Sequence, residues 1–182
     1  MKKFIRFATT GLQLGVALLV SISTVALTQA EEALKVGDKA PAITGKDQND
    51  KVWKLEENLK NKVALLYFYP KDDTPGCTKQ ACGLRDRMGD LKTQGVEVIG
   101  VSMDTSESHR KFIEKYSLNF NLLADADGKI TETYGAKMTG RNLSRRISFL
   151  IGKDGKIIHI TDNPSADKHL EEMKLAIEKL KS

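Results

Sequence analysis

The sequence predicts an α/β fold in which helices flank a central mixed β-sheet. Runs of β-branched and aromatic residues alternate with amphipathic segments over residues 63–116, which is the pattern of parallel strands joined by crossover helices. Residues 147–151 and 157–160 form two further strand candidates, joined by a Gly-Lys-Asp-Gly-Lys turn that is typical of a β-hairpin.

The 182 residues are expected to form one domain, residues 31–182, after an N-terminal leader. Residues 1–30 begin with Lys2, Lys3 and Arg6, continue with an uncharged apolar run, and end in small residues at Ala30. This pattern is typical of a secretory signal peptide. A retained membrane anchor is the alternative, although Ser and Thr residues dilute the apolar run. We expect export to the periplasm, with no membrane attachment after cleavage.

The charge balance gives no indication of a nucleic-acid partner. The whole chain has 29 Lys and Arg against 24 Asp and Glu, a net charge of +5. Three of the positive charges and none of the negative ones lie in the leader, so the mature domain carries only +2. The cluster of Arg141, Arg145 and Arg146 lacks a basic face and interleaved aromatic residues, so nucleic-acid binding is not expected.

The first half of the domain should begin with a β-hairpin, whose strands lie near residues 42–44 and 52–54 on either side of a polar turn. A short helix at 55–59 and a buried strand at 63–69 should follow. The next segment carries apolar residues at helical spacing, Ala81, Leu84, Met88 and Leu91. We expect one helix here, ending near Gly95, because glycine is favoured just after a helix.

The second half should continue with a buried strand at 96–102 and a helix at 105–116. A short strand at 122–123 and a short helix at 130–134 precede the C-terminal hairpin. Ser165 can cap a last helix, whose inward stripe comprises Ala166, Leu170, Met173, Ile177 and Leu180.

Both cysteines of the chain, Cys77 and Cys82, lie in the stretch that links the first buried strand to the following helix. The unpaired N–H groups and the positive dipole at a helix start favour a negatively charged sulfur, so Cys77 should be the reactive thiol. Cys82 lies a turn and a half further along and lacks this advantage. Two cysteines only five residues apart close too small a loop to brace the fold, which favours redox chemistry.

The residues around Cys77 are similar to a known family. Pro70-x3-Thr74-x2-Cys77 resembles the active-site pattern of peroxiredoxins, and residues 69–82 resemble the subgroup called peroxiredoxin Q or bacterioferritin comigratory protein, an atypical two-cysteine type. The similarity extends along the domain through four further blocks: Gly37-Asp38-x-Ala40-Pro41, Gly100-Val-Ser-x-Asp104, His109-x2-Phe112 and Arg146-Ile-Ser-Phe149.

This resemblance implies a thioredoxin-like fold and a thiol peroxidase that reduces hydrogen peroxide and organic hydroperoxides. It implies that Cys77 is the peroxidatic cysteine and Cys82 the resolving cysteine, with Pro70, Thr74 and Arg146 completing the active site. An intramolecular disulfide recycled by a thioredoxin-like reductant is expected, in a monomer. No cofactor is expected, because the sequence contains no nucleotide loop. No metal is expected either, because its three histidines have no ligand-like spacing.

Physical reasons support these assignments separately. Arg146 offers a permanently cationic fork of donors for a thiolate and a peroxide oxygen, while Thr74 offers a hydroxyl and Pro70 a rigid apolar wall. Strand alternation should turn Arg145 away from the site. One departure concerns Gln80, where relatives commonly have glutamate. A neutral amide cannot pair with an arginine as a carboxylate does, which affects how the arginine is oriented.

Two other functions remain open at this point. A general disulfide oxidoreductase usually has the spacing C-x-x-C, whereas this chain has C-x4-C. An exported copper-delivery protein with a thioredoxin-like fold would need a third soft or imidazole ligand beside the two thiolates.

The spacing of the cysteines has a consequence for disulfide formation. If both lie in one regular helix, their Cα atoms are roughly 8.6 Å apart, beyond the roughly 7 Å that a disulfide allows. The helix must then unwind before the second chemical step. Gly83 and Gly89 should weaken it, each by roughly 1 kcal/mol relative to alanine. Alternatively, the two glycines permit close packing.

Overall fold

The computed structural model describes residues 33–181. The expected signal peptide, residues 1–30, lies outside them and stays a prediction. None of the helices in the described part has the length and apolar character of a membrane span. The elements, in chain order, are β1 (Thr44–Asp47), β2 (Val52–Lys54), α1 (Leu55–Leu59), β3 (Val63–Phe68), α2 (Pro75–Asp86), α3 (Met88–Thr93), β4 (Val96–Ser102), α4 (Ser106–Tyr116), β5 (Asn121–Ala124), α5 (Lys129–Thr133), β6 (Ile147–Ile151), β7 (Ile157–Asp162), α6 (Ala166–Glu178) and the 3-10 turn η1 (Lys179–Lys181).

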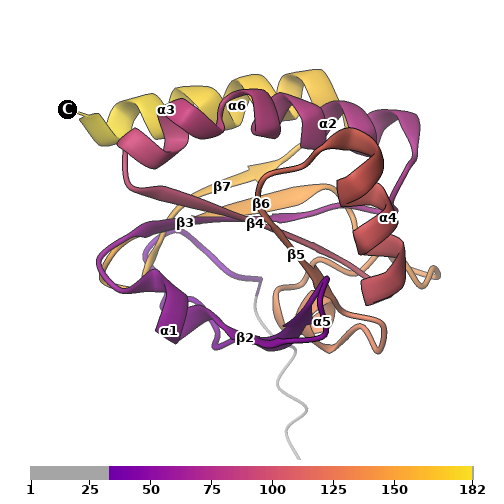
Figure 1. Cartoon of the computed structure of the whole chain (residues 1–182). Helices are drawn as coiled ribbons and strands as arrows, with labels where there is room; N and C mark the ends of the chain where they lie inside the picture. The colour runs from indigo at the N-terminus through magenta and orange to yellow at the C-terminus, as the bar shows by residue number, and fades with distance from the viewer. Residues whose placement is uncertain (1–32, 182) are drawn as a thin grey trace, which may run out of the picture. The chain divides into compact units, whose positions relative to one another are not determined.

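The strands form one mixed sheet in the order β2-β1-β5-β4-β3-β6-β7. Its centre is parallel, through the pairs β3–β4 and β4–β5, whereas β6, β7, β1 and β2 are added antiparallel. The predicted mixed sheet is therefore confirmed, and so is the N-terminal hairpin. Helices cover both faces of this sheet (Figure 1).

The first hairpin strand lies later in the chain than predicted, at Thr44–Asp47 and not at 42–44. The carboxylate of Asp47 accepts hydrogen bonds from the backbone N–H groups of Asn49 and Lys51, at 2.7 and 3.0 Å. Because this side chain closes the turn, Asp47 is the last residue of the strand, and the turn follows it.

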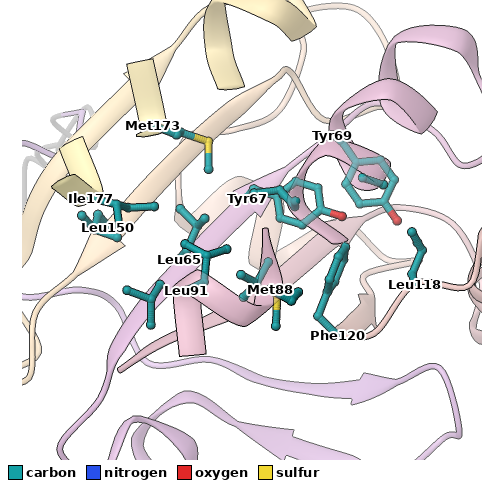
Figure 2. Close-up of a cluster of buried hydrophobic side chains, with 14 of the residues drawn as sticks. Leu65, Tyr67, Tyr69, Met88, Leu91, Leu118, Phe120, Leu150, Met173 and Ile177 are labelled. Carbon is teal, nitrogen blue, oxygen red and sulfur yellow. The ribbon is translucent and has the colours of Figure 1, made fainter. Parts of the chain in front are cut away.

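Alternate residues of β3 supply two separate cores. Leu65 and Tyr67 belong to a cluster under α2, α3, α4 and α6, whereas Leu66 and Phe68 belong to a cluster under α1 and α5. Figure 2 shows the first cluster, with side chains from α3 and α6 around those of β3. All six residues of β3 are buried, as expected for a central strand covered on both faces. β3 therefore ends at a fixed position, directly before the cysteine segment.

The single helix expected over the cysteine segment is broken in two, so that prediction was wrong in this detail. Arg87 separates α2 from α3, with φ −101° and ψ 0°, and its N–H bonds to the carbonyl of Leu84 only three residues earlier. Gly83 and Gly89 flank this break and lower the helix propensity around it. Gly95 follows α3 as predicted, with a φ of +68° that suits glycine.

The last helix also differs from its prediction in two details. Ser165 occupies the N-cap position of α6 but its side chain makes no capping bond; instead, Asn163 accepts a bond from the Ser165 N–H at 3.1 Å. Leu180 was expected on the buried stripe but is 38% exposed, because α6 ends at Glu178 and the chain continues as η1.

Candidate active site

Cys77 lies in the first turn of α2, as the sequence predicted. Thr74 is the N-cap residue with extended backbone, and Pro75 opens the helix at a position where its missing N–H costs nothing. The Cys77 side chain is buried, with 2% of its surface exposed. A sulfur at this point is close to the unpaired N–H groups of the helix start, which favour an anion.

Arg146 donates a hydrogen bond to the sulfur. It directly precedes β6, and its Nη2 donates to Cys77 Sγ at 3.5 Å. The other two nitrogens of the guanidinium are also occupied: Nη1 donates to Oε1 of Gln80, and Nε donates to the carbonyl of Pro164 at 3.1 Å. The guanidinium is therefore fixed at all three nitrogens, with one of them directed at the sulfur.

Arg145 points away from this site, as strand alternation predicted. Its guanidinium pairs with Asp162, and its Nε donates to the carbonyl of Gly135 at 3.2 Å. Its side chain is 37% exposed, whereas Arg146 is 8% exposed. The two neighbouring arginines thus have different environments, one at the surface and one at the sulfur.

The remaining predicted residues lie on the same segment of the chain. Pro70 and Thr74 bound the loop between β3 and α2, and both are half-buried. The Thr74 hydroxyl donates to the carbonyl of Lys71 at 3.0 Å, so it closes the loop on itself. Cys82 is half-buried in the second turn of α2, and both cysteines are free thiols. The structure therefore brings Cys77 and Arg146 into contact and leaves Cys82 separate.

Comparison with known protein families matches residues 36–160 to the AhpC/TSA family. The chain belongs to this family. Peroxiredoxin Bcp of Escherichia coli strain K12 is 45% identical over 142 residues, covering 75% of this chain and 90% of the relative. The chloroplastic peroxiredoxin Q of Sedum lineare is 38% identical over 148 residues, covering 80% of this chain and 78% of the relative.

The structural comparison agrees. The peroxidoxin BcpB of Mycobacterium tuberculosis has a TM-score of 0.76 at 28% identity, covering 82% of this chain and 99% of that structure. The chain is thus a peroxiredoxin of the Bcp and peroxiredoxin Q type, an oxidoreductase of the thiol peroxidase class. Both the thioredoxin-like fold and the enzyme class expected from the resemblance are confirmed.

Gln80 orients the arginine of this peroxiredoxin, a point that the sequence left open because a neutral amide stands where relatives commonly have glutamate. Its side chain is fully buried, and its amide oxygen accepts from Arg146 Nη1. Gly76 is a residue that sequence reasoning did not single out. A Cβ there would lie 3.1 Å from Arg146 Nη2, so glycine lets the guanidinium approach the helix start. The sequence feature that could have pointed to Gly76 is the glycine in the first turn of a predicted helix, where glycine lowers helix stability.

The buried contacts of His169 with Ser148 and Asn163 support the segment whose carbonyl holds Arg146. His169 of α6 is fully buried; its Nδ1 lies 3.1 Å from the carbonyl of Asn163 and its Nε2 lies 2.8 Å from Ser148 Oγ. Because a carbonyl can only accept, Nδ1 carries the proton and Nε2 accepts from the serine. Burial lowers the pKa of His169 to about 4, and the Arg146 charge contributes to this shift. His169 thus fixes Asn163, next to the Pro164 carbonyl that holds Arg146.

The depressed pKa of His169 predicts acid sensitivity. Its pKa is about 4 in the folded protein, against 6.5 for an ordinary histidine, so the unfolded chain binds a proton first as the pH falls. The free energy of unfolding should be highest above pH ~6.5 and should decrease toward pH ~4, by on the order of 3 kcal/mol. Urea unfolding across this range should show a smaller pH dependence in His169→Gln. A matched His159→Gln variant, changed at a half-buried site, should keep most of the pH dependence of the free energy of unfolding. An unchanged pH dependence in His169→Gln would show that His169 is not its source.

Proposed function

We propose that this peroxiredoxin reduces hydrogen peroxide and organic hydroperoxides with Cys77 as the peroxidatic and Cys82 as the resolving cysteine. The observation that carries the proposal is the buried Cys77 sulfur at the start of α2, with Arg146 Nη2 donating to it at 3.5 Å. A thiolate in this position has a fixed direction, cationic donors and little water around it, which are the conditions that nucleophilic attack on a peroxide needs.

In the first step, the Cys77 thiolate attacks one peroxide oxygen. The S–O bond forms as the O–O bond breaks, and the leaving hydroxide or alkoxide takes up a proton and departs as water or alcohol. The sulfur is oxidised to a sulfenic acid, and the peroxide is reduced by two electrons. Arg146 is suited to hold both the thiolate and the developing negative oxygen, because its donors form a rigid fork.

In the second step, the Cys82 thiolate attacks the sulfur of the sulfenic acid. The S–S bond forms as the S–O bond breaks, and the leaving hydroxide takes up a proton and departs as water. This step needs the helix to open. Both cysteines lie in α2, so their Cα atoms are roughly 8.6 Å apart on faces about 140° apart. A disulfide requires roughly 7 Å or less. We propose that part of residues 77–88 unwinds between the two steps.

The break at Arg87 supports such opening, because α2 already ends four residues after Cys82. The two glycines of this region differ in their roles. A Cβ at Gly83 would lie 2.8 Å from Leu170 Cδ1, so this glycine allows α2 to pack closely on α6. Gly89 has no atom within 4 Å of its Cβ position, so it affects only helix propensity. The packing role that the sequence left open applies to Gly83 alone.

A dithiol reductant must return two electrons and two protons to the disulfide, and we propose a thioredoxin-like partner for this step. We also propose that the enzyme works as a monomer, because the disulfide forms within one chain. The copper-delivery alternative is less well supported. The Arg146 guanidinium directed at Cys77 repels a metal cation, whereas it favours a thiolate.

The two cysteines should respond differently to substitution. Cys77→Ser should abolish peroxide reduction, because it removes the nucleophile. Cys82→Ser should still react once and accumulate sulfenic acid, which over-oxidises in excess peroxide because no second thiol captures it. Peroxide loss, free-thiol counts and intact mass measured together distinguish the two variants. If Cys82→Ser lost the first turnover as completely as Cys77→Ser, the assigned roles would be reversed or wrong.

The two arginines offer a matched pair of variants. Arg146→Lys should slow the oxidation of Cys77 by about tenfold or more, because an ammonium cannot reproduce the forked contacts to the sulfur and Gln80. Arg145→Lys changes a surface pair and should have little effect. Stopped-flow measurement of single-turnover oxidation decides between them, and equal effects in both variants would contradict the proposed role of Arg146.

We further propose that residues 1–30 direct export to the periplasm and are cleaved near Ala30, which leaves an enzyme that is not attached to the membrane. The basic, apolar and small-residue order of the leader supports this. Intact-mass analysis of the protein from its native compartment should give a chain that begins near Glu31. A full-length chain in the membrane fraction would contradict the proposal.

A further inference from the structure

A buried polar network lies behind the loop between β3 and α2. At its centre is the carboxylate of Asp72, which is 6% exposed. Three side chains bond to it: the Tyr69 hydroxyl at 2.7 Å, the Ser108 hydroxyl at 2.7 Å and Nδ1 of His109 at 2.8 Å. Burial raises the pKa of Tyr69 well above its ordinary value, so its hydroxyl stays a donor. An ionised carboxylate can accept all three of these hydrogen bonds at once.

His109 of α4 is the counter-charge in this network. Its side chain is fully buried, and its two ring nitrogens face acceptors on opposite sides. Nδ1 faces the Asp72 carboxylate, and Nε2 lies 3.1 Å from the carbonyl of Leu123 in β5. A neutral imidazole can donate from only one nitrogen, so both contacts are satisfied together by the doubly protonated ring. The geometry thus favours a buried ion pair between His109 and Asp72.

The pair is connected to the active-site loop. Asp72 lies between Pro70 and Thr74, and its backbone N–H donates to the Asp104 carboxylate at 2.9 Å. Asp104 also accepts from the Ser102 hydroxyl at 2.7 Å, at the end of β4. The loop that leads into α2 is therefore attached at Asp72 to both α4 and β4. Where Asp72 lies determines where the first turn of α2, and with it Cys77, can lie.

We propose that His109 is a positioning residue for the peroxide reaction: as a buried imidazolium it fixes Asp72, and so holds the start of α2 where the Cys77 sulfur meets Arg146. This inference rests on the proposed peroxidase function. It accounts for Ser102, Asp104 and His109, which the sequence similarity includes but which do not contact the sulfur. The two ends of the cysteine segment then differ: the loop before Cys77 is attached to its neighbours, whereas the helix after Cys77 is interrupted at Arg87.

The protonation state of His109 can be measured in the wild-type protein. Nitrogen-15 NMR of the three imidazoles at pH 7 should show two protonated ring nitrogens for His109 and one for His169, whose Nε2 accepts from Ser148. The variants His109→Gln and His169→Gln assign the signals. A wild-type His109 with a single protonated nitrogen would overturn the proposal.

Kinetics on the same proteins test positioning. In His109→Gln, single-turnover oxidation of Cys77 by hydrogen peroxide should slow ten- to a hundredfold, since small displacements of reacting groups have effects of this size. The pH-independent rate of Cys77 alkylation by iodoacetamide, measured where the thiol is fully ionised, does not require Arg146 to hold a peroxide oxygen and should change less than about twofold. The exposed pair Glu107–Lys111 on the same helix offers a control, Lys111→Gln, which should react like wild type.

The double variant Asp72→Asn with His109→Gln should oxidise faster than His109→Gln alone, because it removes the uncompensated buried carboxylate. If the peroxide and alkylation rates fell equally in His109→Gln, His109 would have only a general structural role and the proposal would be overturned. A peroxide rate in His109→Gln equal to that of the wild type would overturn it too. Failure of the wild-type protein to oxidise at Cys77 would instead contradict the proposed function. The two failures are therefore distinguishable.

Discussion

The contact between the Arg146 guanidinium and the Cys77 sulfur is the interaction on which the rest of the site depends. Arg146 is almost fully buried, and the acceptors described around it are the Gln80 amide, the Pro164 carbonyl and the sulfur. The first two are neutral. A buried cation needs an anion nearby to offset its desolvation, and the ionised Cys77 is suited to that role. Gln80, in place of a carboxylate, orients the arginine without neutralising it.

A second constraint acts against the first. The site needs an intact first turn of α2 for attack on peroxide, but the position of Cys82 in the same helix prevents a disulfide while that helix is regular. Different parts of the chain meet these two requirements, an intact first turn of α2 and a helix that can open around Cys82. Before Cys77, the loop is attached to α4 and β4 through Asp72. After Cys82, the helix is interrupted at Arg87. Between these two residues it is held by its packing on α6 near Gly83, by the buried Leu84 and by the bond from Arg85 Nη1 to the Tyr116 carbonyl at 2.6 Å.

Local sequence patterns predicted most of the fold and the centre of the site. Hydrophobic periodicity placed Cys77 at the junction of a buried strand and a helix. The family resemblance selected Arg146, and alternation then turned Arg145 the other way. The break at Arg87 was not predictable, because Ala81, Leu84, Met88 and Leu91 keep a helical period across it. The roles of Gly76 and the Asp72–His109 pair were also missed, and the way in which Gln80 orients Arg146 was left open. These residues act on partners that are 37 to 70 positions away in the chain, and only the folded sheet brings them together.

The coupling of helix opening to disulfide formation is tested most directly by amide hydrogen exchange on the reduced and the disulfide forms of the enzyme. We predict that residues 77–88 lose protection on oxidation while β3 and β6, which are buried at the centre of the sheet, keep theirs. Mass-spectrometric peptides that cover the loop before Cys77 should change less than those after it. Equal protection of residues 77–88 in the two redox states would contradict the account.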